Sequence, residues 1–217
     1  MDQRIIWVLR EYRSGSTWFT MKLCKLLNKE FYFFDNKLKT NFQDREKFFV
    51  SRKQEKDDYM RILNTHHYFA LKSFDNYNNP IVFNITRKNR TEQFLSFYFA
   101  FKYSSNIPNK VAVNLSKDKL DLFPKYEKHV VPEVDALEFC KTVKSNSALW
   151  YNNCNNFEHE TIYYEDLLDG YNSKLLRTNL CMETEMDNDL PVKLPYNKQE
   201  VVLNYSKIEN IILENTN

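Results

Sequence analysis

The start of the chain changes from a strand pattern to a helix pattern across a short polar loop. Ile5 to Leu9 is an apolar run with the length and β-branched content of a buried strand. Residues 17–27 then take up a helical period. The apolar face of that helix is formed by Phe19, Leu23, Leu26 and Leu27. The sequence therefore predicts a strand, a tight loop and a helix in that order.

The same two patterns predict further strands and helices along the chain. Pro80 introduces the clearest strand, Ile81 to Thr86, which runs directly into basic residues. Thr91 can cap a helix that continues to about Tyr103. The apolar face of that helix is expected to be Phe94, Phe97, Tyr98 and Phe101. The other predicted elements are a strand over 31–34, a helix over 134–156, a strand over 161–164 with an acidic helix start at 165–167, and a last helix over 205–213.

The remaining stretches give weaker signals. Residues 36–58 fit a helix or a mobile cover, 68–77 a helix or irregular chain, and the proline-containing segment 104–132 a long loop with short helical pieces. Residues 61–67 form a brief apolar stretch that ends in two histidines. Because no repeat or linker divides the chain, we expect a single α/β domain over residues 1–217. Its three layers would enclose a central parallel sheet of about four or five strands.

The glycine content draws attention to the first loop. Average usage near 7% would give about 15 glycines in a chain of this length, but there are only 2, Gly15 and Gly170. A glycine between a strand and a helix lets the backbone turn sharply and approach a ligand, and the amides that open the helix favour an anion. In the simpler alternative, Ser16 only caps the helix and Gly15 only turns the chain.

Charge and cysteine usage exclude several classes of protein. A net charge of +2 argues against broad binding of nucleic acid, so any anion site must be local. The 4 cysteines, Cys24, Cys140, Cys154 and Cys181, form no CxxC pair, so we expect reduced residues that lie mostly in the core. No run of apolar residues is long enough to span a membrane. We therefore expect a soluble, intracellular protein of the cytoplasm.

Three segments, taken in order, resemble motifs of sulfotransferases that use 3′-phosphoadenylyl sulfate (PAPS). Residues 12–18, YRSGSTW, resemble the 5′-phosphosulfate loop P-K/R-S-G-S/T-T-W. Residues 85–89, ITRKN, with Ser96 in the following helix, resemble the 3′-phosphate element, and residues 163–167, YYEDL, resemble a later strand-to-helix segment. The joint match covers roughly residues 4–168 and is more specific than any one motif. It implies the P-loop NTPase-like sulfotransferase fold.

The resemblance also implies roles for individual residues. Arg13, Ser14, Gly15, Ser16 and Thr17 would hold the 5′-phosphate of the donor, where negative charge builds up during transfer. Trp18 would stack on or wall off the adenine, and Tyr164 would touch the same base. The 3′-phosphate would be held by Arg87 or Lys88 together with Ser96; the usual spacing points to Lys88, whereas the arginine stands at position 87.

The expected general base is His66, because many family members carry a Thr-His pair at a matching distance before the 3′-phosphate element. The adjacent His67 is an alternative, and Asn64 stands where the family often has a lysine. The family's basic C-terminal R-K-G loop has no counterpart, and Lys193, Lys198 or another basic residue would have to replace it. No cluster of residues has metal-ligand spacing, so the expected transfer needs no metal.

The resemblance thus implies a sulfotransferase that moves a sulfuryl group from PAPS to a hydroxyl or amine by in-line displacement and releases adenosine 3′,5′-bisphosphate. The acceptor would be a small molecule, a carbohydrate or a lipid. One alternative is a P-loop kinase, although the chain lacks GxxxxGK[ST]. The other is a nucleotide-binding module of the same fold without turnover.

Overall fold

In a computed structural model the chain is described for residues 4–27, 31–33, 60–66, 80–104, 128–168 and 197–216. For residues 4–5, 31–33, 60–66 and 101–104 only the backbone is described. The chain divides into two compact units, residues 1–86 with 146–188 and residues 87–145 with 189–217. The expectation of one domain over the whole chain stays a prediction. The expected elements over 36–58 and 68–77, together with the greater part of the loop over 104–132, lie outside the described residues.

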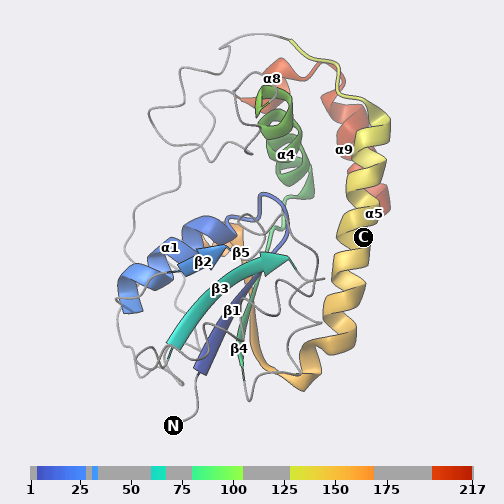
Figure 1. Ribbon diagram of the computed structural model, residues 1–217. Helices are drawn as coiled ribbons and strands as arrows, with labels where there is room; N and C mark the ends of the chain where they lie inside the picture. The colour runs from blue at the N-terminus through green and yellow to red at the C-terminus, as the bar shows by residue number, and fades with distance from the viewer. Residues whose placement is uncertain are drawn as a thin grey trace. The chain divides into compact units, whose positions relative to one another are not determined.

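The first unit is built on a five-stranded sheet in the order β2-β3-β1-β4-β5, and every pair of neighbouring strands is parallel (Figure 1). Its strands are β1 (Arg4–Arg10), β2 (Phe31–Phe33), β3 (Met60–His66), β4 (Ile81–Thr86) and β5 (Glu158–Tyr163). Among its described residues, the helical elements that lie wholly within this unit are α1 (Ser16–Leu27), the short 3₁₀ turn η3 (Cys154–Asn156) and α6 (Tyr164–Leu168). The predicted α/β class with a parallel sheet is confirmed.

The hydrophobic core of this unit lies between α1 and one face of the sheet. Ile6 and Val8 of β1 and Phe83 of β4 point to that face, and all three are buried. Phe19 of α1 packs on Phe83 with ring centroids 5.3 Å apart. Leu23 follows Phe19 by one helical turn and is fully buried as well. The predicted apolar face of the first helix therefore does pack on the sheet.

Two strands differ from the sequence-based expectation. β3 was not predicted as a strand, because the apolar stretch in residues 61–67 is limited to Ile62 and Leu63. The strand forms by pairing with β1 on one side and β2 on the other. β5 begins at Glu158 rather than at residue 161, and Tyr164 starts α6 instead of ending the strand. β5 lies at the edge of the sheet with only Ile162 buried, so its first half carries no apolar signal.

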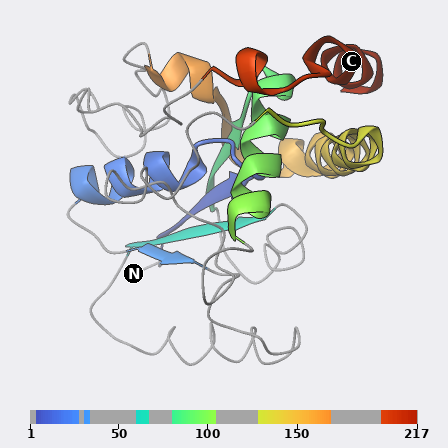
Figure 2. The same cartoon turned by 90° about the horizontal axis from the view of Figure 1, so that it is seen from above.

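The described part of the second unit consists mainly of helices. They are α4 (Arg90–Ser104), α5 (Glu133–Asn153), which continues into the first unit at residue 146, α8 (Lys198–Val201) and α9 (Tyr205–Thr216). In Figure 2, seen from above, α5 and α9 run side by side. Buried side chains from these helices form one hydrophobic cluster, which includes Phe94, Phe99, Ala136, Phe139, Ile208 and Ile212.

The buried face of α4 is wider than predicted. Phe94, Leu95 and Phe99 are fully buried, whereas Phe97 and Tyr98 are only partly buried against the same cluster. Apolar side chains occur nearly all round this helix, so their spacing alone does not select one face. The helices predicted over 134–156 and 205–213 correspond to α5, which ends at Asn153, and to α9, which extends to Thr216. The three described cysteines are free and buried, as expected, and Cys181 lies outside the described residues.

Candidate functional site

The candidate site lies at the carboxyl edge of the parallel sheet. Arg10, the last residue of β1, pairs in register with His66 at the end of β3 and with Ile85 of β4. Thr86, which ends β4, pairs with Tyr163, which ends β5. Four strands therefore end within about one residue of each other. Open parallel sheets bind ligands at this edge, because the loops that follow the strands gather there.

The loop after β1 folds tightly before α1 begins. Ser14 donates to the carbonyl oxygen of Glu11 with its backbone amide at 3.4 Å and with its hydroxyl at 3.0 Å. Arg13 and Gly15 both have positive φ, 58° and 80°. The amide of Phe19 donates to the carbonyl oxygen of Gly15 at 3.0 Å, so Gly15 holds the cap position of α1 and Ser16 is its first helical residue. The alternative in which Ser16 caps the helix is therefore wrong.

Gly15 lies directly against the ring of Tyr164. A Cβ on Gly15 would overlap Cδ2 of Tyr164 and would come within 2.9 Å of Cε2. The positive φ and the aromatic ring of Tyr164 thus require a glycine at this position, whether or not a ligand also approaches it. The structure brings together two of the sequence motifs, residues 12–18 and 163–167, which are far apart along the chain.

Glu11 is a residue of this site that sequence reasoning missed. The residue is only 5% exposed, and its Oε2 accepts a hydrogen bond of 2.9 Å from the hydroxyl of Thr86. The bond joins the start of the loop to the end of β4. The sequence carried no signal for this burial, because a glutamate at the end of a strand is normally exposed to solvent.

The other expected residues of this loop differ in their exposure. Ser14 and Ser16 are buried, whereas Arg13, Thr17 and Trp18 are partly exposed. Trp18 packs against the hydrophobic core between α1 and the sheet. Nζ of Lys22, one turn later on α1, lies 5.8 Å from the centre of the Trp18 ring. This distance is within the range of a cation–π contact. The assigned contact of Trp18 with adenine stays a prediction.

In the second unit, the basic segment after β4 leads into α4. Asn89, not Thr91, caps this helix: its Oδ1 accepts the backbone amide of Glu92 at 2.9 Å, and Thr91 is buried inside the first turn. Asparagine and threonine can both cap a helix, but α4 begins at Arg90, so the capping position is residue 89. Lys88 is exposed, whereas Arg87 and Ser96 are partly buried, so all three remain candidates for the 3′-phosphate.

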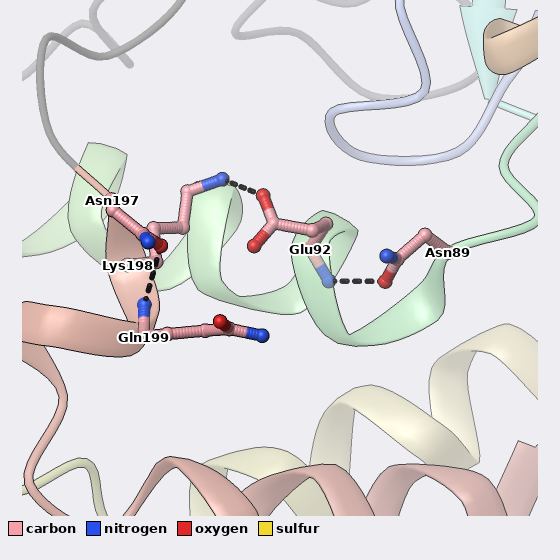
Figure 3. Close-up of polar contacts among 5 residues, drawn as sticks. All are labelled: Asn89, Glu92, Asn197, Lys198 and Gln199. Atoms are coloured by element: carbon pink, nitrogen blue, oxygen red, sulfur yellow. Dashed lines mark hydrogen bonds and ion pairs between the residues drawn. The ribbon is translucent and has the colours of Figure 1, made fainter.

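Lys198, one of the two lysines considered as a replacement for the missing basic loop, forms an ion pair with Glu92 (Figure 3). The side chain of Lys198 is 11% exposed and that of Glu92 30%. Asn197 caps α8 by accepting the amide of Gln199 at 3.1 Å, which fixes the backbone next to the lysine. A cation from residue 198 is thereby held at the first turn of α4. Lys193 lies outside the described residues.

For His66, the expected base, the structure describes only the backbone. His66 is the last residue of β3 and lies beside Arg10 in the register, next to the start of the loop. Its neighbour His67 lies outside the described residues. The choice between the two histidines therefore stays open. The register does put position 66 at the same sheet edge as the glycine loop.

Among the described residues, no group of three or more His, Cys, Asp or Glu side chains is arranged to hold a metal ion, and no helix is long and apolar enough to cross a membrane. Comparisons of the chain with protein-family models, with curated proteins and with solved structures each found no match.

Proposed function

We propose that the protein is a PAPS-dependent sulfotransferase that acts on a hydroxyl or amine acceptor. The observation that supports this best is the packing of Gly15 on Tyr164 at the carboxyl edge of the sheet. Two of the three segments that resemble the family's donor site meet there, although nothing in their local sequence requires them to do so. The proposal includes that family's three-layer fold, a cytoplasmic location and a small-molecule, carbohydrate or lipid acceptor.

The loop has the groups that sulfuryl transfer requires. During an in-line displacement, negative charge builds up on the departing 5′-phosphate, so fixed donors lower the barrier. The amides of the first turn of α1 have no acceptor within the helix, and the helix dipole favours an anion at this end. Arg13 adds a cation. The hydroxyl of Ser14 donates to Glu11, so we assign Ser14 to the support of the loop.

The 3′-phosphate distinguishes this donor from ordinary adenine nucleotides. We assign it to Arg87 or Lys88 with Ser96, and Lys198 is the candidate for the basic residue that the C-terminal part must supply. The ion pair with Glu92 supports Lys198, since it holds an ammonium group at the first turn of the helix that carries Ser96. His66 is the proposed base, with His67 as the alternative.

A thermal-shift experiment tests the proposal without knowledge of the acceptor. A ligand that binds only the folded protein stabilises it by RT ln(1 + [L]/Kd), which is about 2.7 kcal/mol at 100 times Kd. Adenosine 3′,5′-bisphosphate should raise the unfolding temperature by several degrees more than AMP at the same concentration. A larger shift with ATP and Mg²⁺ would favour a kinase. A bisphosphate-selective shift without sulfuryl transfer from labelled PAPS to any of a panel of alcohols, amines, sugars and glycolipids would favour a binding module.

A further inference from the structure

Glu11 occupies a position that the proposed chemistry does not explain. The residue is buried, with 5% of its surface exposed, and it lies next to a loop proposed to bind an anion. A buried carboxylate is costly unless it is hydrogen-bonded, and a negative charge near a phosphate weakens binding. Its presence at this point therefore calls for a role other than contact with the ligand.

The hydrogen bonds of Glu11 suggest what that role is. The main-chain carbonyl oxygen accepts both the amide and the hydroxyl of Ser14, at 3.4 and 3.0 Å. The carboxylate accepts the hydroxyl of Thr86 at 2.9 Å, and Thr86 is also buried. Glu11 thus holds the loop through its main-chain carbonyl oxygen and the neighbouring strand β4 through its side chain.

The loop needs such an anchor because its backbone is strained. Arg13 has φ 58°, a left-handed conformation that costs a residue with a Cβ about 1–2 kcal/mol. Conformations of this kind persist only where the surrounding structure fixes them. Thr86 provides a fixed point, because β4 pairs with β1 on one side and β5 on the other and is buried along its whole length.

We propose that Glu11 is a positioning residue, which fixes the anion-binding loop to the end of β4 through its hydrogen bond with Thr86. The role of the loop as an anion site rests on the proposed function; the anchoring itself does not. Glu11 acts as an acceptor toward Thr86, so an amide oxygen in its place keeps this hydrogen bond in a weaker form and no longer repels an anion.

Amide hydrogen exchange without ligand tests the anchoring. Thr86→Val should speed exchange of the Ser14 to Thr17 amides about 10-fold, the effect expected when one buried hydrogen bond is lost, and Thr86→Ser should restore the wild-type rate. Glu11→Ala should match Thr86→Val, and the double variant should add little to either. Thr161→Val is the matched control: the Thr161 hydroxyl accepts a hydrogen bond of 3.4 Å from the side-chain amide of Asn84 on the same sheet, and none of its described hydrogen bonds reaches the loop.

Titration with adenosine 3′,5′-bisphosphate separates the two claims. Thr86→Val should weaken binding about 5-fold or more, and Glu11→Gln should bind as tightly as the wild type or tighter. If Thr86→Val leaves loop exchange as slow as Thr161→Val does, the anchoring inference is wrong whatever the ligand result. If the wild type ignores the bisphosphate while Thr86→Val still loosens the loop, the anchoring stands and the proposed function falls.

Discussion

Replacement of Gly15 by alanine tests whether the loop is held as described. The new Cβ meets two separate penalties. The first is the backbone, since φ is 80° at this residue. The second is the ring of Tyr164, whose Cγ lies 3.3 Å and whose Cε2 lies 2.9 Å from the position of that Cβ, with Cδ2 closer still.

The two penalties can be given magnitudes. A left-handed backbone costs an L-residue about 1–2 kcal/mol, and forcing an extra methyl group into a packed region costs about 1–3 kcal/mol. We expect Gly15→Ala to lower the free energy of unfolding by about 2–5 kcal/mol, the sum of both ranges. Removal of the ring by Tyr164→Ala relieves only the second penalty. In that background, Gly15→Ala should cost about 1–2 kcal/mol.

The assay is urea unfolding of the wild type, both single variants and the double variant, which gives the coupling energy directly. Tyr163→Ala is the control partner, because Tyr163 is exposed and has no contact with Gly15 among those described. It should be additive with Gly15→Ala. An equal cost of Gly15→Ala with and without the ring of Tyr164 would refute the packing of these two residues.

Four further outcomes are expected. Asn89→Ala should lower the free energy of unfolding by about 1 kcal/mol in a urea titration, because it removes the cap of α4, while Asn89→Asp should not. Lys198→Met should lower affinity for the bisphosphate in calorimetry and leave affinity for AMP nearly unchanged, because the lysine is assigned to the 3′-phosphate; equal losses for both ligands would contradict this. Burial raises the pKa of Cys24 from 9.0 to about 11. Between these two pKa values the folded state keeps the thiol proton and the unfolded state releases it. The contribution of Cys24 to stability is therefore complete below pH 9 and is lost as the pH rises to about 11. In urea titrations, the free energy of unfolding should fall more steeply with pH for the wild type than for Cys24→Ala. His66→Ala should lower turnover in a transfer assay without weakening nucleotide binding, and unchanged turnover would transfer the role to His67.

The sequence pattern was sufficient to predict an element where the element's own side chains are apolar and buried. Residues 81–86 were predicted with their observed bounds because all six side chains are buried in the sheet. The first helix was predicted from residue 17, one residue after its observed start. β3 could not be found in this way, since the polar residues Asn64 and Thr65 belong to a strand whose stability comes from pairing with β1 and β2.

In the candidate site, too, local features were predictable from the sequence and contacts between distant segments were not. The glycine loop was visible because a chain nearly without glycine places one between a strand and a helix. The bond between Glu11 and Thr86 was not visible, because it joins residues 75 positions apart and depends on the order of the strands. The pairing of Glu92 with Lys198 likewise depends on how helices from distant parts of the chain pack. Motifs identify the chemistry of single segments, whereas the contacts between segments follow from topology.

The proposed function requires that this chain binds the donor of a sulfuryl transfer. Calorimetric titration with adenosine 3′,5′-bisphosphate tests it most directly, with AMP and ATP·Mg²⁺ as comparison ligands and Arg13→Ala as the comparison variant. We expect the bisphosphate to bind more tightly than either comparison ligand, and Arg13→Ala to abolish most of that affinity. Tighter binding of ATP·Mg²⁺, or no binding of any of the three ligands, would overturn the proposed function.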